Sequence, residues 1–116
     1  MFINPVLLAK IRSKAITEYA NGQTGSLRLP GICNHDRATT VWAHLPGIGK
    51  SMGSKVSDLH GCFACSNCHS AIDTHSYDFR GLTDAMVLDA MLRGLAESQA
   101  ILTMAGIIKV RGARLI

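Results

Sequence analysis

The cysteines constrain this chain more than any other feature of its sequence. Cys65 and Cys68 are separated by two residues, and Cys33 follows a Pro-Gly turn far upstream. A spacing of two residues lets both thiolates of a Cys-x-x-Cys pair face one tetrahedral zinc ion, and Cys33 supplies a third thiolate. We therefore predict a structural zinc site. Three residues are candidates for its fourth ligand, namely Cys62, His35 and His60, and Cys62 is favoured.

Other uses of the cysteines are weighed against this prediction. Free cysteine is among the most buried residue types, so two or three of the four are alternatively small core residues. A redox dithiol of the thioredoxin kind is disfavoured, because the surrounding sequence lacks an alternating strand-helix-strand pattern.

The composition favours a small protein with an unusual core. The chain has 116 residues, of which 47% are hydrophobic but only 5% aromatic. Such a chain forms one domain and is not disordered, and with few large aromatic side chains its core is expected to be completed by bound metal. The net charge of +4 suits a polyanionic partner without identifying one.

No segment of the sequence is typical of export or membrane insertion. The apolar patch within residues 1–9 follows Pro5 and precedes the first basic residues, which is the reverse order of a secretion signal. No stretch approaches the roughly 20 apolar residues that cross a bilayer. We expect a cytoplasmic protein with reduced cysteines and no membrane partner.

The pattern of apolar residues predicts helices at both ends and a ββα unit between them. An N-terminal helix is expected from Asn4 and Pro5 to Asn21-Gly22, and a long helix from Thr83, as N-cap, to Gly106. Short strands are expected at 41–45 and 59–64, followed by a knuckle and short helix at 65–75. The last ten residues are expected to add a short strand and a basic tail.

Several motifs in fixed order resemble the HNH endonuclease superfamily. More narrowly, they resemble a family of short, largely uncharacterised nuclease-like proteins encoded by phages and prophages. The motifs span residues 27–73, and the segment 107–109 after the long helix also fits. The quoted segments are Arg-Leu-Pro-Gly-Ile-Cys-Asn at 28–34, Ala-His at 43–44, Asp-Leu at 58–59, Ala-Cys-Ser-Asn-Cys-His at 64–69 and Ile-Asp at 72–73.

The resemblance implies a fold and a division of the chain. The expected fold is a small α+β protein with a zinc-knuckled ββα-metal core of the treble-clef or HNH kind, an N-terminal helix and a long C-terminal helix. Residues 1–22 would be a helical extension, and residues 23–116 the nuclease domain including the C-terminal helix. Together they would form one compact unit.

The resemblance also implies roles in phosphodiester hydrolysis. His44 would be the general base, and Asp58 would stand where the family's middle residue orients it. His69 and Asp73, four residues apart on one helix face, would hold a catalytic Mg²⁺, Mn²⁺ or Zn²⁺. The products would carry 5′-phosphate and 3′-hydroxyl ends.

Two departures from the family pattern affect the ligand sets. Many HNH proteins place an acid or histidine directly before the base, but here that residue is Ala43. Another cysteine commonly precedes the Arg-Leu-Pro-Gly segment, whereas this chain has Gly25, so Cys62 is a candidate replacement.

The combined prediction is a metal-dependent DNA endonuclease or nickase acting in phage DNA recombination or processing. Lys50 and Lys55, in a glycine-rich loop, are candidate phosphate contacts, and little base-specific reading is expected. A recombination protein is a further candidate partner. The alternatives are a non-catalytic zinc-containing nucleic-acid adaptor of the same fold, and a structural zinc protein that binds another protein through its long helix.

Overall fold

A computed structural model of the chain describes residues 10–46 and 56–116. Within these residues the chain forms two short strands and three α-helices, which confirms the predicted α+β class. In chain order the elements are α1 (Lys14–Tyr19), the 3₁₀ helix η2 (Arg37–Thr39), β1 (Val41–His44), β2 (Gly61–Ala64), α2 (Ser66–Thr74), the 3₁₀ helix η3 (Ser76–Arg80) and α3 (Asp84–Met104).

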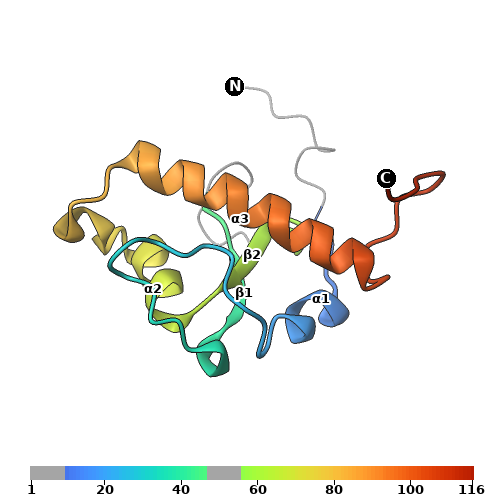
Figure 1. The fold of residues 1–116 in the computed structure, drawn as a ribbon, viewed down its shortest axis with the longest axis horizontal. Helices are drawn as coiled ribbons and strands as arrows, with labels where there is room; N and C mark the ends of the chain where they lie inside the picture. Colours follow the sequence, from blue (N-terminus) through green and yellow to red (C-terminus); the bar gives the residue numbers. More distant parts are fainter. Residues whose placement is uncertain (1–9, 47–55) are drawn as a thin grey trace.

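The longest helix, α3, runs across the two-stranded sheet, and α1 and α2 lie toward opposite ends of α3 (Figure 1). Both strands were expected near these positions, and each is slightly shorter than its predicted range. Within the described ranges no helix is both long enough and apolar enough to span a membrane.

The two strands pair antiparallel, with Trp42 opposite Phe63 and His44 opposite Gly61. A Cβ on Gly61 would lie 2.5 Å from the Trp42 ring and 2.8 Å from the carbonyl oxygen of Ala43. Only glycine therefore lets Trp42 lie against the end of β2. Trp42 then meets Phe63 edge-on, with ring centroids 5.6 Å apart. This packing fixes the end of β1, from which His44 projects.

The helices α2 and α3 begin and end with recognisable caps. Cys65 is the N-cap of α2, and its sulfur accepts the Cys68 N–H. Thr83 caps α3 by accepting the Met86 N–H, and Gly106 follows the helix with a φ of 77°. The predicted short helix after Cys65, the predicted cap at Thr83 and the predicted stop at Gly106 are confirmed.

The predicted course of both chain ends needs correction. The N-terminal helix begins at Lys14, capped by Ser13, and residues 10–13 are not helical. These residues bond instead to a distant segment: the Ser13 N–H reaches Asp58, and the Asp58 N–H reaches the Ile11 carbonyl. The predicted start at Asn4 and Pro5 lies outside the described residues. At the other end, residues 107–116 contain no strand, so the predicted final strand is wrong.

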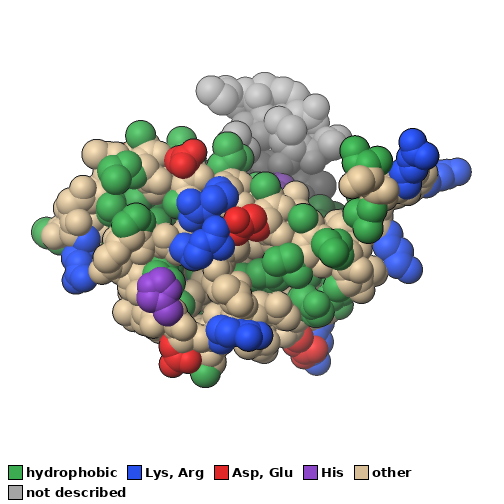
Figure 2. Space-filling model, in the orientation of Figure 1, with side chains coloured by type: hydrophobic (Ala, Val, Ile, Leu, Met, Phe, Trp, Pro, Cys, Tyr) green, Lys and Arg blue, Asp and Glu red, His purple; other side chains and the backbone are tan. Residues whose placement is uncertain are grey.

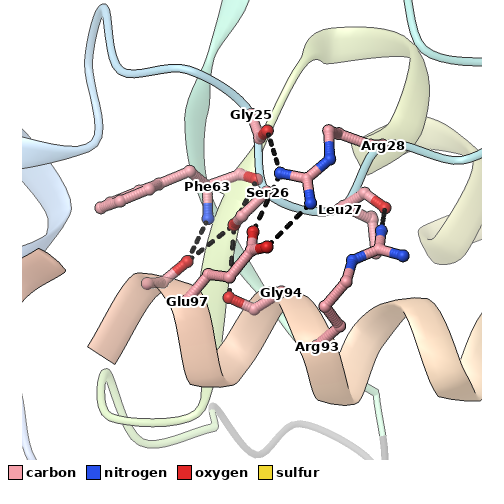
Figure 3. Close-up of polar contacts among 9 residues, drawn as sticks. Gly25, Ser26, Leu27, Arg28, Phe63, Arg93, Gly94 and Glu97 are labelled. Atoms are coloured by element: carbon pink, nitrogen blue, oxygen red, sulfur yellow. Dashed lines mark hydrogen bonds and ion pairs between the residues drawn. The ribbon is translucent and has the colours of Figure 1, made fainter. Parts of the chain in front are cut away.

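A set of polar contacts joins α3 to the segment 25–28 and to β2 (Figure 3). Buried Ser98 accepts the Phe63 N–H at 3.1 Å and lies 2.8 Å from the Ser26 hydroxyl. Arg28 and Glu97 form a bidentate ion pair, with guanidinium nitrogen to carboxylate oxygen distances of 2.8 and 2.9 Å. Because Gly94 has no side chain, the helix backbone lies close to Ser26, where a Cβ would be 3.2 Å from its carbonyl oxygen. These contacts hold the segment that leads into Cys33.

The core divides into two groups around the sheet. One group brings Leu27 and Leu29 together with the cysteines, α2 and the first half of α3. The other gathers Trp42 and Phe63 with residues of α1 and the end of α3. The knuckle is therefore built into the main core.

The outward face of α3 is partly apolar. Figure 2 shows hydrophobic side chains gathered along this helix, with arginine and acidic side chains between them. The exposed large hydrophobic residues on α3 are Met86, Leu88, Leu92, Ile101 and Met104. Binding of another protein through this helix stays a prediction.

Candidate functional site

Three of the four cysteines meet beside the N-terminus of α2. The sulfurs of Cys33, Cys65 and Cys68 all lie within 4.8 Å of one another. The Cys33 and Cys65 sulfurs are 3.9 Å apart. Bond lengths of about 2.3 Å in a tetrahedral zinc site put two sulfurs about 3.8 Å apart. The spacing of these thiols therefore fits a single metal ion.

Backbone N–H groups surround this cysteine cluster, as in a metal knuckle. The Cys65 sulfur accepts N–H groups from Cys68 at 3.4 Å and Asn34 at 3.5 Å, and the Cys68 sulfur accepts the Leu29 N–H at 3.4 Å. Burial raises the pKa of the Cys65 thiol, but its hydrogen bonds outweigh burial and bring that pKa below the ordinary value. Burial dominates at Cys68 and raises its pKa. Donors directed at sulfur favour the thiolate form that metals bind.

The loop carrying Cys33 is tied to the start of α2 by side chains. Asn34 donates to the Ser66 hydroxyl at 3.2 Å and to the Thr39 hydroxyl at 3.3 Å. The Thr39 hydroxyl in turn accepts the Ser66 N–H at 3.2 Å. These bonds hold Cys33 near the Cys-x-x-Cys pair, although more than 30 residues separate them in the sequence.

Cys62, the favoured fourth ligand, is not brought into this cluster. It is fully buried on β2 and packs against Gly94 of α3, where a Cβ would lie 3.4 Å from its sulfur. Burial raises the pKa of the Cys62 thiol to about 12, so it behaves as a small core residue. The other two candidates differ: His60 is exposed at the end of the hairpin, whereas His35 Nδ1 lies 3.7 Å from the Cys33 sulfur.

Apart from the cysteine cluster, a histidine and a carboxylate form a hydrogen-bonded pair at the end of β1. His44 Nε2 lies 2.7 Å from Asp58 Oδ1. The other carboxylate oxygen accepts the Ser13 N–H, also at 2.7 Å. The Asp58 side chain is only 7% exposed, whereas that of His44 is 37% exposed. One buried carboxylate thus orients a histidine whose ring reaches solvent.

The electrostatics of this pair determine its protonation. Burial raises the pKa of Asp58, but the hydrogen bonds from Ser13 and His44 outweigh it and hold the pKa below its usual value of 3.8. An ionised carboxylate can only accept hydrogen bonds, so His44 Nε2 carries a hydrogen. In a neutral ring, Nδ1 is then the nitrogen that can accept a proton.

His69 and Asp73 lie on one face of α2. His69 Nε2 is 3.1 Å from Asp73 Oδ2, and both side chains are partly exposed. The predicted spacing on one helix face is confirmed, because residues four apart lie one turn above each other. The helix α2 also contacts β1, the strand that ends at His44.

The sequence analysis missed one residue that holds Asp58 in place, and one of its predictions concerns residues outside those that the structure describes. The missed contributor is Ser13, which bonds Asp58 through its backbone N–H from 45 residues away, so no side-chain motif could reveal it. The predicted phosphate contacts Lys50 and Lys55 lie outside the described residues.

Comparisons with known proteins identify the family to which this chain belongs. A family model described as "Putative nuclease YbcO" matches residues 14–106. Relatives with the same description in Escherichia coli (strain K12) and Enterobacteria phage 82 are each 36% identical over 92 residues, covering 78% of this chain and 92% of the relative. A solved chain, described as "Structure of a putative bacteriophage protein from Escherichia coli str. K-12 substr. MG1655", matches with a TM-score of 0.61 at 30% identity, covering 78% of this chain and 98% of that one. The chain therefore belongs to the YbcO family, whose model extends from α1 to just beyond the end of α3.

Proposed function

We propose that this protein is a metal-dependent DNA endonuclease or nickase of the HNH kind. The contact between His44 and Asp58 carries the proposal, because a buried carboxylate 2.7 Å from a solvent-reaching imidazole is the arrangement of an oriented general base. The names of the family and of its relatives support nuclease activity. The succession of β1, β2 and α2 supports the HNH assignment.

His44 would act through Nδ1. Asp58 accepts the hydrogen on Nε2, so Nδ1 is left to take a proton from the attacking water. Imidazole is the side chain that most often accepts and releases protons in catalysis near neutral pH. Asp58 would position the ring and stabilise the imidazolium that forms.

His69 and Asp73 fit a catalytic divalent cation. Ligand bonds of about 2.1 Å at right angles place two ligand atoms about 3.0 Å apart, and the observed separation is 3.1 Å. Imidazole nitrogen and carboxylate oxygen together suit Mn²⁺ or Zn²⁺, and the carboxylate suits Mg²⁺. When bound, such a cation supplies Lewis-acid chemistry by offsetting charge on the scissile phosphate and on the leaving oxygen.

The three-cysteine cluster would hold a structural zinc ion. Cys65 caps α2 and Cys68 directly precedes His69, so a metal held by these thiols would fix the helix that carries the catalytic ligands. The donor set supports zinc, because thiolates select this soft-ligand metal over Mg²⁺ and Ca²⁺.

The substrate in this proposal is DNA bound mainly through its phosphates. The net charge of +4 supports a polyanionic partner, and Lys50 and Lys55 are proposed to contact the backbone. The relative in Enterobacteria phage 82 supports an association with phages. The proposed role is phage DNA processing or recombination in the host cytoplasm, with a recombination protein as a further proposed partner.

Nicking of supercoiled plasmid tests the proposal. The wild-type protein should nick plasmid with Mg²⁺ or Mn²⁺, and the His44→Ala variant should be slower by about 10²- to 10⁴-fold, the usual contribution of a general base. His60→Ala is the matched control, because His60 is an exposed histidine on the same hairpin. If no divalent metal supports nicking by wild-type protein that binds DNA normally, the enzyme assignment is wrong.

A second function is favoured by Ala43. Its side chain is fully buried and has no atom that can bind a metal, so fewer metal ligands lie beside the proposed base His44 than in many HNH proteins. A DNA-binding zinc adaptor without turnover would need no such ligand. It predicts salt-sensitive DNA binding by both wild type and His44→Ala, with no cleavage by either.

A further inference from the structure

The three-thiol cluster is one ligand short of a tetrahedral zinc site, and we propose that His35 is the fourth ligand. The centre would then have three cysteines and one histidine. This inference rests on the structural zinc proposed above, but not on the nuclease activity.

The distance between His35 and the cluster supports direct coordination. Zinc bonds of about 2.3 Å to sulfur and about 2.0 Å to nitrogen, at the tetrahedral angle, put the two ligand atoms about 3.5 Å apart. His35 Nδ1 lies 3.7 Å from the Cys33 sulfur. The Cys33–Cys65 distance of 3.9 Å fits the same ion. His35 does not lie within 4.8 Å of all three sulfurs, so its ring would have to move toward Cys65 and Cys68 when the ion binds.

The backbone of this loop turns His35 back toward Cys33. His35 has a φ of 56°, in the left-handed region that residues other than glycine rarely adopt. Asn34 holds the turn by accepting the Asp36 N–H at 2.8 Å. A residue kept in this conformation two positions beyond a cluster cysteine is consistent with a ligand role, because a bond from its side chain to the metal would offset the strain.

The open side of the cluster faces the space beside His35. A pocket of about 170 Å³ is lined by Cys33, Cys65 and His35 together. Cys68 does not line it and is fully buried. A ligand in this pocket lies beside both Cys33 and Cys65, and His35 is the imidazole that lines it.

The other candidate ligands either have another role or lie away from the pocket. Asp36 also lines the pocket, but its carboxylate accepts the Ala38 N–H and caps the 3₁₀ helix η2. Cys62 packs against α3, and His60 is exposed at the end of the hairpin. Arg28 and Arg37 line the pocket as well. Arg28 is already paired with Glu97, so Arg37 is the one whose charge would complement a centre that carries one net negative charge, as three thiolates, a neutral imidazole and Zn²⁺ do.

Cobalt substitution of the full chain tests the ligand set. Wild-type protein should bind one Co²⁺ or Zn²⁺ per cluster, with cobalt absorption typical of three thiolates and one nitrogen. His35→Cys should keep the metal, raise the thiolate-to-cobalt charge-transfer absorption by about one third and move the ligand-field bands to longer wavelength. His35→Ala should weaken zinc binding at least about tenfold in competition with a chelator. His60→Ala should match the wild type.

Two outcomes distinguish failure of the His35 inference from failure of the structural zinc proposal on which it rests. If the wild-type cluster binds metal but His35→Ala keeps the wild-type cobalt spectrum and zinc affinity, His35 is not a ligand, while the structural zinc stands. If the wild type takes up no metal at the cysteines, both are wrong. Should His35→Ala fail to fold, the Nδ1 nitrogen resonance of His35 in wild-type protein decides: a zinc-dependent shift supports the ligand role and an unchanged resonance overturns it.

Discussion

Asp58 joins three parts of the structure, so its replacement gives the most informative prediction. Its carboxylate bonds to His44 at the end of β1 and to the N–H of Ser13 at the cap of α1. Asp58→Ala removes both acceptors. Asp58→Asn keeps one oxygen, which can accept the hydrogen on His44 Nε2 as the carboxylate does.

The size of the effect follows from these two contacts. Hydrogen bonds to a charged group contribute about 1.5–3 kcal/mol each, and both contacts of Asp58 measure 2.7 Å. The half-exposed His44 can be hydrated after the substitution, so the lower end applies to its bond. We expect Asp58→Ala to lower the free energy of unfolding by about 3 kcal/mol and Asp58→Asn by about half as much. The base would also lose its orientation, so nicking should fall about 10- to 100-fold in Asp58→Ala.

Urea unfolding followed by circular dichroism measures the stability, and plasmid nicking under conditions where each variant is folded measures the activity. The order expected in both assays is wild type, then Asp58→Asn, then Asp58→Ala. If Asp58→Ala unfolds at the wild-type urea concentration and nicks at the wild-type rate, this carboxylate neither supports the N-terminal segment nor orients His44.

Three further predictions concern acid stability and packing. Because the pKa of Asp58 is lowered in the folded protein, its contribution is present above the unfolded-state value of 3.8 and is lost as the pH falls from there through the folded-state pKa; urea unfolding at a series of pH values should show wild type and Asp58→Asn differing above pH 3.8 and converging only below it. Gly61→Ala should cost about 3 kcal/mol, since its Cβ would lie 2.5 Å from the Trp42 ring, and an unchanged thermal midpoint would contradict that packing. Ser98→Ala should cost about 1–3 kcal/mol by leaving the buried Phe63 N–H without an acceptor; faster hydrogen exchange at Phe63 is the accompanying sign, and its absence would argue against the contact.

The parts of the fold that follow from local signals could be predicted from the sequence. Thr83 and Gly106 bound α3 because a hydroxyl cap and a left-handed glycine act within one turn of the helix. The knuckle at Cys65 and Cys68 follows from spacing in the same way. The resemblance in motif order also predicted that Asp58 orients His44, and in the structure the two side chains are in contact.

The parts that depend on distant contacts could not be predicted. Cys62 stands at a regular interval before Cys65, but it lies on a strand while Cys68 lies on a helix, so equal spacing does not put the three sulfurs on one side. Pairing of residues 11–13 with 57–58 keeps the N-terminal segment out of the helix that its own periodicity favours. The sequence left His35 as one of three candidate ligands and favoured Cys62, because only the left-handed turn in the structure brings the His35 ring to Cys33.

The roles proposed for His69 and Asp73 make metal dependence the central claim, and a metal titration tests it most directly. Protein loaded with zinc at the cysteines should nick supercoiled plasmid only after Mg²⁺ or Mn²⁺ is added, and Asp73→Asn should need about tenfold more metal for half of the maximal rate. Full nicking without added metal, unchanged in Asp73→Asn, would contradict the account.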